Sequence, residues 1–179
     1  MDDDILMTLY RNGDMEAFEM LFERHRTSVY NFAFMMLNDA GKAEDMMQET
    51  FMTVARVARE YDCRGCFKTW IMRIVRNRCV NALNMEQTRR KVFKESGIQV
   101  IDSPSREPSP LQVAERTEQL RAVRKAIAGL PEREREAIVL YVFDRMEYHE
   151  IAAILQIPLN TVKSLIYRAR SDIARSIDD

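Results

Sequence analysis

A short stretch near the C-terminus concentrates positive charge without a compensating acid. "PLNTVKSLIYRAR", residues 158–170, contains Lys163, Arg168 and Arg170. Drawn as a helix, this stretch and the residue after it present one polar face: Lys163, Ser164, Tyr167, Arg168 and Ser171. Cations, hydroxyl groups and a phenol ring at this spacing suit the edges of bases in a DNA major groove. The pattern predicts a helix that contacts DNA; a plain helical hairpin with a charged outer face is the alternative.

A second basic stretch lies in the first half of the chain. Residues 63–91 hold 8 basic and 1 acidic side chains, net +7, and follow residues 1–62 with 6 basic and 13 acidic, net -7. The whole chain has a formal charge of -1. This separation of charge indicates one face for a polyanion and another for a basic or polar partner. A solvated basic helix is the simpler alternative.

The C-terminal stretch also has the elements that would position its polar face. The apolar stripe of the same helix consists of Val162, Ile166, Ala169 and Ile173. Upstream, "EYHEIAAIL" predicts a short helix with Ile151, Ala152 and Leu155 turned inward, and "QIP" turns the chain. This order is typical of a helix-turn-helix, whose second helix reads bases. "LPEREREAIVLYVF" predicts a supporting helix, with Pro131 suited to its first position.

The N-terminal part of the chain has helical periodicity in three stretches, residues 14–37, 43–59 and 67–84. Asp14 is suited to cap the first of them. "IDSPSREPSP" is rich in Pro and Ser and has no apolar period, which is typical of a flexible linker. We therefore predict an all-α protein with two small helical domains, residues 1–90 and 113–179, joined by a flexible linker over 91–112.

Several other classes of protein are disfavoured. No apolar run is long enough for a membrane span, and the acidic N-terminus lacks a signal-peptide pattern, so we expect a soluble cytoplasmic protein. Cys63-x-x-Cys66, with Cys79 nearby, suggests a redox or metal site, but neither a βαβ pattern nor paired histidines accompany it. No nucleophile–base pair, carboxylate pair or phosphate-binding loop is visible. We expect no enzyme activity, no metal and no cofactor.

Longer stretches resemble a known family. "LPEREREAIVLYVFDRMEYHEIAAILQIPLNTVKSLIYRAR" resembles region 4 of bacterial RNA polymerase sigma factors of the extracytoplasmic-function (ECF) group. "DMEAFEMLFERHRTSVYNFAFMMLND" is similar to region 2.1, "KAEDMMQETFMTVAR" to region 2.2, and "RGCFKTWIMRIVRNRCVNAL" to regions 2.3 and 2.4. The resemblance implies binding to core RNA polymerase and promoter DNA, promoter-specific initiation, and an anti-sigma factor as a further partner.

The alternative is a helix-turn-helix regulator that binds DNA without docking on core polymerase. Such a regulator would carry a sensing module in its N-terminal half. Residues 43–84 disfavour this alternative, because a sensing module gives no reason for an acidic helix followed by a basic, aromatic-bearing one.

The resemblance also implies three sets of contacts. Region 2.2 docks on the polymerase, and its matching polar residues are Asp45, Gln48 and Glu49. Regions 2.3 and 2.4 melt the minus-ten element with cations, amides and stacking rings, which match Phe67, Lys68, Trp70, Arg73, Arg76, Asn77 and Asn81. Region 4 contacts the minus-thirty-five element, through residues matching Asn160, Lys163, Ser164, Tyr167 and Arg168. Trp70, the single tryptophan, is equally suited to a place in the core.

The sequence departs from the family pattern at two positions and in one loop. Leu165 stands where members usually have arginine, and Asn160 where they usually have glycine. We expect Leu165 to add apolar surface toward DNA, suited to a thymine methyl, and Asn160 to accept a hydrogen bond near the helix start. The loop "YDCRGCFKTW" is shorter than the usual form, so the family's base preference there does not carry over.

Overall fold

The computed structural model describes residues 1–62, 66–95 and 118–178. Within these ranges the chain forms α-helices and one 3-10 turn, Ala58–Glu60, and no strand, which confirms the all-α prediction. The N-terminal module comprises α1 (Asp3–Arg11), α2 (Met15–Leu37), α3 (Ala40–Val57) and α4 (Phe67–Glu95). The C-terminal module comprises α5 (Glu118–Ala128), α6 (Glu132–Val142), α7 (Tyr148–Leu155) and α8 (Leu159–Asp178). Sequence periodicity did not predict α1 or α5.

The predicted linker and the predicted Cys63 site fall mostly outside the described residues. Cys63 and the linker residues 96–112 are among those not described. Residues 91–95, which we assigned to the linker, instead continue α4. The helix therefore extends past the end of the predicted 67–84 stretch, because the sequence up to Glu95 contains neither Gly nor Pro to stop it.

Local sequence sets the ends of the N-terminal helices. Asp14 caps α2, as predicted, by accepting from two backbone N–H groups of the first turn at 3.0 and 3.2 Å. Asn38 ends α2 in the left-handed conformation, with φ 52°, which asparagine tolerates better than most residues. Asp39 then caps α3 by accepting from the N–H of Lys42 at 3.0 Å. The Asn-Asp pair thus turns the chain so that α2 and α3 pack side by side.

The apolar face of α4 belongs to the core of the N-terminal module. Phe67, Ile71, Val75 and Cys79 recur every four residues and are all buried. They pack with residues of α1 and α2, among which Leu6, Met7, Leu21 and Phe32 are fully buried. Burying such side chains stabilises the module by roughly 1.5–3 kcal/mol each. This packing fixes the rotation of α4 and directs its opposite, polar face away from the core.

The helix-turn-helix of the C-terminal module is confirmed. The backbone N–H of Glu147 donates to the Glu150 carboxylate at 2.8 Å at the start of α7. Gln156 ends α7 in the left-handed conformation, with φ 54°, and α8 begins after Pro158. The predicted stripe of α8 lies inward: Val162, Ile166 and Ala169 are buried, and Ile173 is half-buried. The second helix is therefore held by the face opposite its cations.

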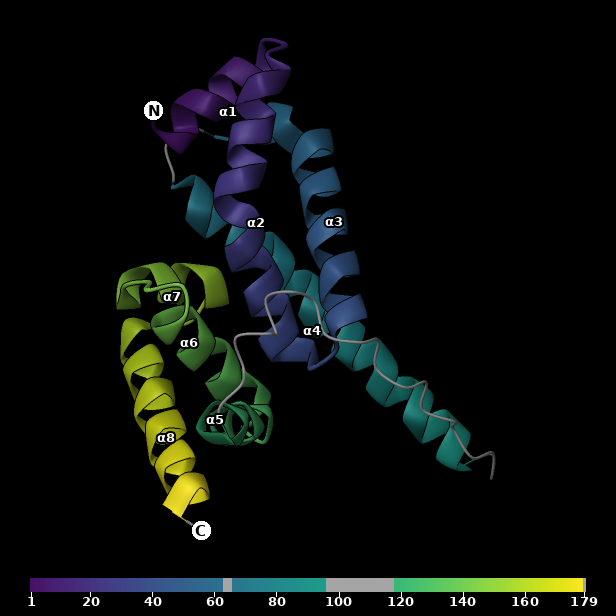
Figure 1. Ribbon diagram of the computed structural model, residues 1–179, viewed down its shortest axis with the longest axis vertical. Helices are drawn as coiled ribbons and strands as arrows, with labels where there is room; N and C mark the ends of the chain where they lie inside the picture. The colour runs from purple at the N-terminus through teal and green to yellow at the C-terminus, as the bar shows by residue number, and fades with distance from the viewer. Residues whose placement is uncertain (63–65, 96–117, 179) are drawn as a thin grey trace.

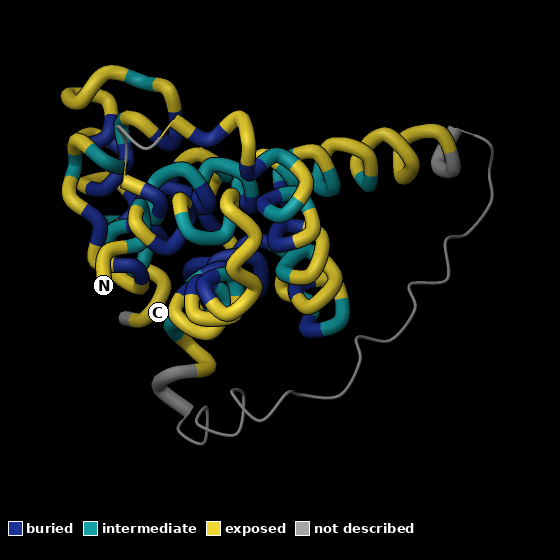
Figure 2. The backbone as a smooth tube through the Cα atoms, turned by 90° about the horizontal axis from the view of Figure 1, so that it is seen from above, coloured by how far each residue is buried: buried dark blue, intermediate teal, exposed yellow. Residues whose placement is uncertain are grey.

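The two modules are in direct contact. α4 packs against α7, and α2 packs against α5 and α6. Figure 1 shows the C-terminal module beside the lower part of α2, while the end of α4 projects away from both modules. Figure 2 shows the same projecting helix, most of whose residues are exposed. The contact between modules therefore involves the first half of α4, where the predicted minus-ten residues lie.

Candidate nucleic-acid interface

Two cations of the predicted minus-ten set donate to backbone carbonyl groups of the C-terminal module. Lys68 Nζ donates to the backbone oxygen of Asp144 at 2.6 Å. Arg73 Nη2 donates to the backbone oxygen of Ala153, in α7, at 2.8 Å. The structure therefore brings these cations to one side of α4, where both are half-buried and contact the other module.

The third cation, Arg76, forms an ion pair with Glu136 of α6. Arg76 Nε lies 2.7 Å from Glu136 Oε1, and the two side chains are 13% and 0% exposed. Burial raises the pKa of Glu136, while the hydrogen bond and the charge of Arg76 act in the opposite direction. Arg133 approaches the other carboxylate oxygen at 3.5 Å. Removing one partner of such a buried pair typically costs about 3–5 kcal/mol, because the other charge stays buried.

A second buried acid, Asp144, lies in the segment between α6 and α7. It is 4% exposed, and among the described residues its Oδ2 has no hydrogen-bond partner. Burial raises the pKa of Asp144 to about 6, although a hydrogen bond with Ser28 of α2 and the charge of Lys68 lower it. Its partners belong to the N-terminal module, so Asp144 is an acid of the junction between modules.

The two aromatic residues at the start of α4 have different environments. Phe67 is 1% exposed and packs against His25, Tyr61 and Trp70, with ring centroids 5.1, 5.8 and 5.8 Å away. The prediction that Phe67 stacks on an unpaired base is therefore wrong for this conformation, since neither face of its ring is open. Trp70 is half-buried, with its ring centroid 4.7 Å from that of Tyr61, and part of its surface stays accessible.

The amide residues of α4 lie further along the helix and are exposed. Asn77 accepts a hydrogen bond from Arg76 Nη1 at 3.1 Å, and Asn81 is exposed. Arg78, in contrast, turns toward α3, where it pairs with Glu49. Asn77 and Asn81 thus remain available to base edges.

The reading face of α8 is open. The residues predicted to contact the minus-thirty-five element are all exposed: Asn160, Lys163, Ser164, Tyr167 and Arg168. Tyr167 is 76% exposed, far more than a phenol ring in a core. Ser164 Oγ donates to the backbone oxygen of Asn160 at 3.0 Å, and Arg168 Nε lies 3.5 Å from Glu134 Oε1. The structure therefore groups these five side chains on one face of one helix. The spacing had placed four of them there, and Asn160 was added by the family resemblance.

Leu165 does not belong to this face. It is 6% exposed and packs in the core of the C-terminal module. The expectation that it presents apolar surface to DNA is wrong, because it follows Val162 by three residues and precedes Ala169 by four. That spacing places Leu165 at the edge of the buried stripe.

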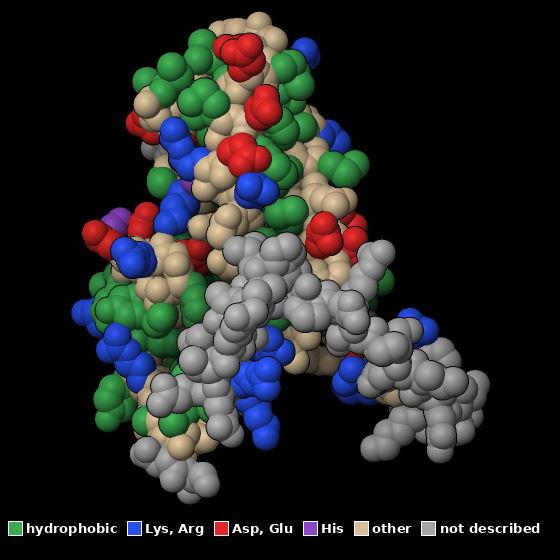
Figure 3. Space-filling model, in the orientation of Figure 1, with side chains coloured by type: hydrophobic (Ala, Val, Ile, Leu, Met, Phe, Trp, Pro, Cys, Tyr) green, Lys and Arg blue, Asp and Glu red, His purple; other side chains and the backbone are tan. Residues whose placement is uncertain are grey.

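The three residues predicted to dock on polymerase lie together on α3. Asp45, Gln48 and Glu49 are all exposed, and the buried face of α3 carries Phe51 and Val54. Figure 3 shows acidic side chains over the α2–α3 face of the N-terminal module. An exposed acidic and amide-bearing helix face can pair with a basic partner.

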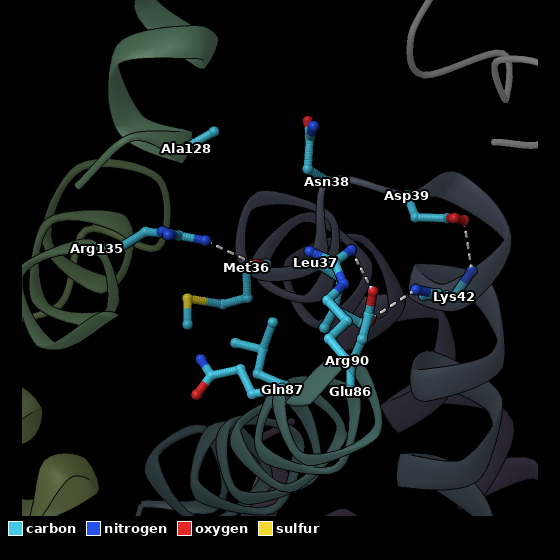
Figure 4. A pocket seen from close by; sticks show the side chains of 11 residues that line it. Met36, Leu37, Asn38, Asp39, Lys42, Glu86, Gln87, Arg90, Ala128 and Arg135 are labelled. Carbon is cyan, nitrogen blue, oxygen red and sulfur yellow. Dashed lines mark hydrogen bonds and ion pairs between the residues drawn. The ribbon is translucent and has the colours of Figure 1, made fainter. Parts of the chain in front are cut away.

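A cleft of about 480 Å³ lies between the modules, next to the C-terminal end of α2. Figure 4 shows Arg135 reaching from α6 to the backbone oxygen of Met36, which it meets at 3.0 Å. Across the cleft, Glu86 accepts from Lys42 at 2.9 Å and from Arg90 at 2.8 Å. The pKa of Glu86 is lowered, and the hydrogen bond from Lys42 is the largest cause. Of these contacts, that of Arg135 joins the two modules, whereas those of Glu86 lie within the N-terminal module.

Sequence reasoning missed the residues that join the modules, above all Glu136, Asp144 and Arg135. A signal for Glu136 existed: it stands four residues before the fully buried Leu140, so the periodicity of α6 already placed it on the buried face. Among the described residues, no cluster of His, Cys, Asp and Glu could hold a metal ion. In the same residues, no helix has the length and apolar character to cross a membrane. Cys66 is exposed and Cys79 is buried, where burial raises its pKa to about 12.

Comparisons with known proteins match both modules. Sigma-70 region 2 matches residues 21–89, and Sigma-70, region 4 matches residues 120–173. The ECF RNA polymerase sigma-E factor of Escherichia coli (strain K12) is 31% identical over 187 residues, covering 99% of this chain and 95% of that protein. The RNA polymerase sigma-H factor of Pseudomonas aeruginosa is 30% identical over 183 residues, covering 98% and 93%.

Solved structures share the arrangement of both modules. The sigma factor RpoE in complex with the anti-sigma factor NepR, from Bartonella quintana, has a TM-score of 0.72 at 25% identity and covers 90% of this chain and 96% of its own. CnrH, in complex with the cytosolic domain of CnrY, has the same fold, with a TM-score of 0.73 at 23% identity over 98% and 97% of the two chains. With region 2 and region 4 in order and a relative of this identity along nearly its whole length, the chain belongs to the ECF family of RNA polymerase sigma factors.

Proposed function

We propose that this chain binds core RNA polymerase in the cytoplasm and directs it to a specific set of promoters. In this role α3 docks on the polymerase through Asp45, Gln48 and Glu49. The polar face of α4 holds the melted minus-ten element, and α8 reads the minus-thirty-five element. The role is one of binding and positioning, and the chemistry of RNA synthesis belongs to the polymerase.

The observation that carries this proposal is the exposed reading face of α8 in a chain that also has a region 2 module. Lys163, Tyr167 and Arg168 are all more than a third exposed. Their cations, ring and hydroxyl lie on the side of α8 opposite its core contacts, as a helix entering a major groove requires. A regulator acting without polymerase would need no region 2, and residues 21–89 match that region.

For the minus-ten element we assign the phosphate contacts to Lys68, Arg73 and Arg76 and the base contacts to Asn77 and Asn81. Cations hold phosphates irrespective of sequence, whereas amides can pair with base edges. Trp70, half-buried at the start of α4, offers the one aromatic edge of this set that is not enclosed. Phe67 is left out because it is buried.

We also propose that an anti-sigma factor controls this chain. The relative RpoE was solved in complex with the anti-sigma factor NepR, and it is similar to this chain over both modules.

Run-off transcription on genomic fragments tests the function. Core polymerase with the chain should yield discrete transcripts that core alone does not, and the chain should co-purify with core. A docking variant, Gln48→Ala with Glu49→Ala, should weaken co-purification with core and run-off transcription together. A chain that binds promoter fragments specifically in the absence of core would support a regulator and contradict the proposal.

A further inference from the structure

We propose that the nucleic-acid face of α4 continues past the predicted minus-ten residues, through Asn84, Thr88 and Lys91. These residues bind the phosphate backbone of the promoter duplex directly upstream of the minus-ten element, in the spacer that leads to the minus-thirty-five element. This inference rests on the proposed function, because it adds contacts with the same promoter. It also goes beyond the family match, since region 2 matches residues 21–89 and Lys91 follows them.

One stripe of residues without any acid runs along most of α4. Its members follow one another at steps of 4, 4, 3, 4 and 3 residues, which is the spacing of a single helix face. The members are Arg73, Asn77, Asn81, Asn84, Thr88 and Lys91. The first three belong to the predicted minus-ten set, whereas the last three were not predicted. The added residues therefore lie in line with those that we assign to the minus-ten element.

The added part of the stripe is accessible. Its three residues are exposed, on the part of α4 that projects away from both modules (Figure 2). None of the three lines the cleft between the modules, whereas Glu86, Gln87 and Arg90 of the same helix do (Figure 4). The stripe therefore faces away from the cleft, and a partner can reach it.

The side chains of the added residues suit phosphate. Lys91 is the last of three consecutive cations, residues 89–91, so the local field attracts a polyanion. The amide of Asn84 and the hydroxyl of Thr88 are groups that contact phosphate oxygens in protein–DNA interfaces. Thr88 Oγ1 donates to the backbone oxygen of Asn84 at 2.9 Å. This hydroxyl can rotate toward a phosphate, because the backbone oxygen keeps its N–H donor within the helix.

Helix geometry indicates which part of the DNA the added residues meet. Because an α-helix rises about 1.5 Å per residue, Lys91 lies about 15 Å beyond Asn81 along α4. Phosphates of one DNA strand follow one another at about 3.4 Å along the duplex, so this distance corresponds to about four base pairs. The melted element is assigned to the earlier part of α4, and the chain then continues toward α8, which we assign to the minus-thirty-five element. The end of α4 therefore falls beside the duplex between the two elements.

Two matched pairs of substitutions test this placement in the full-length chain. Lys91→Ala removes the cation of the stripe, and Arg90→Ala removes the adjacent cation, which pairs with Glu86 at 2.8 Å on the cleft side. Asn84→Ala removes an amide of the stripe, and Gln87→Ala removes an amide on the cleft side. Lys91→Arg keeps the charge and should bind as wild type. All four positions are exposed, and circular dichroism checks that each variant keeps its helical content.

The measurement is the affinity of core polymerase with the bound chain for a promoter fragment recovered by run-off transcription. Between about 50 and 200 mM salt, wild type should lose about 3.5-fold more affinity than Lys91→Ala, which is the effect of one phosphate contact. Asn84→Ala should bind about two- to tenfold more weakly with unchanged salt dependence, because a neutral amide displaces no counterion. Arg90→Ala and Gln87→Ala should behave as wild type. On a fragment whose duplex ends at the upstream edge of the minus-ten element, every variant should bind as wild type does.

Equal salt dependence for Lys91→Ala and Arg90→Ala on the complete fragment overturns the proposal. A loss for Lys91→Ala that persists on the shortened fragment also overturns it, because the contact would then be with the minus-ten strand or with the polymerase. Weaker binding of Lys91→Ala to core alone would assign this face to the polymerase and has the same consequence. All these results leave the proposed function standing, as long as wild-type chain supports run-off transcription. Failure of run-off by wild-type chain overturns the function, and this inference falls with it.

Discussion

Arg76 and Glu136 stand 60 residues apart in the sequence and form a 2.7 Å ion pair that joins the two modules of the chain. Glu136 is fully buried, and Arg76 comes from the face of α4 that was expected to hold DNA. The residue that the sequence assigns to a phosphate thus has an internal anion as its partner. In this conformation the guanidinium group that we assign to a DNA phosphate is occupied by a carboxylate of the C-terminal module.

The first prediction concerns pH and Asp144. Its pKa in the folded chain is about 6, above the ordinary 3.8, so the unfolded chain ionises first as pH rises. The contribution of Asp144 to the free energy of unfolding is therefore greatest below about pH 4. It falls by on the order of 3 kcal/mol as pH rises through 6. The groups facing Asp144 are Ser28 and Lys68, and both lower its pKa without cancelling the effect of burial. We expect Asp144→Asn to be more stable than wild type at pH 7.5 and equal to it near pH 4.

Urea unfolding at several pH values measures this difference. Asp172→Asn, on the more open surface of α8, serves as the control and should track wild type throughout. A stability gain for Asp144→Asn that is the same at pH 4 and pH 7.5 would contradict the assignment, since a neutral aspartic acid gives no reason for one.

The second prediction concerns Leu165. Because Leu165 is buried in the C-terminal core, Leu165→Ala should lower the free energy of unfolding by about 2–5 kcal/mol. Leu165→Arg should be worse and should not raise affinity for DNA, since a cation would enter an apolar core. Tyr167→Ala, two residues away but exposed, should change stability by no more than about 0.5 kcal/mol. Thermal and urea unfolding measure the stability of each variant. A Leu165→Arg chain that is as stable as wild type and binds DNA more tightly would show that the side chain at position 165 faces DNA and not the core.

Much of the fold follows from local sequence. Asp14 and the Asn38-Asp39 pair mark helix ends, because their side chains supply hydrogen bonds or tolerate the left-handed backbone. The apolar stripes of α4 and α8 follow from spacing alone. Spacing was also the better guide where resemblance misled: Phe67 precedes the buried Ile71 by four residues, and Leu165 lies beside the buried stripe of α8.

The contacts between modules could not be predicted in the same way. Arg73 and its acceptor on Ala153 are 80 residues apart, and that acceptor is a backbone oxygen that every residue possesses. A pattern of charge shows that a helix face will bind an anion or a carbonyl group, but not which one. The sequence therefore predicted candidate site residues by their type, whereas the groups that they contact in the other module could be found only from the structure.

The third prediction concerns docking. Gln48→Ala with Glu49→Ala should weaken binding to core polymerase and leave helical content unchanged, since both residues are exposed on α3. Glu49 also pairs with Arg78 on α4, but an exposed pair of this kind contributes only about 0–1 kcal/mol. Glu19→Ala, exposed on α2, is the control for loss of one surface acid. Competition binding to core measures the effect, and an affinity equal to wild type would remove this face of α3 from the docking surface.

The last prediction separates base contacts from phosphate contacts on α8. Lys163 lies in the first half of the helix, where side chains reach base edges. If it meets a guanine, Lys163→Ala should cost about 1–3 kcal/mol and relax preference at one or two base pairs. Arg168 lies further along α8, and its Nε is 3.5 Å from Glu134 Oε1. We therefore assign Arg168 to a phosphate at the side of the groove and not to a base edge.

Arg168→Ala should therefore weaken all promoters alike and reduce the salt dependence of binding by about one unit. A promoter-library transcription assay with core polymerase at two salt concentrations measures both variants. Arg170→Ala is the control, because Arg170 is equally basic but its guanidinium lies over the ring of Tyr141, 5.1 Å from the centroid. An unchanged minus-thirty-five preference for Lys163→Ala would show that the reading face is placed wrongly. An altered preference for Arg168→Ala would move the base contact to Arg168, because a phosphate contact carries no sequence information of its own.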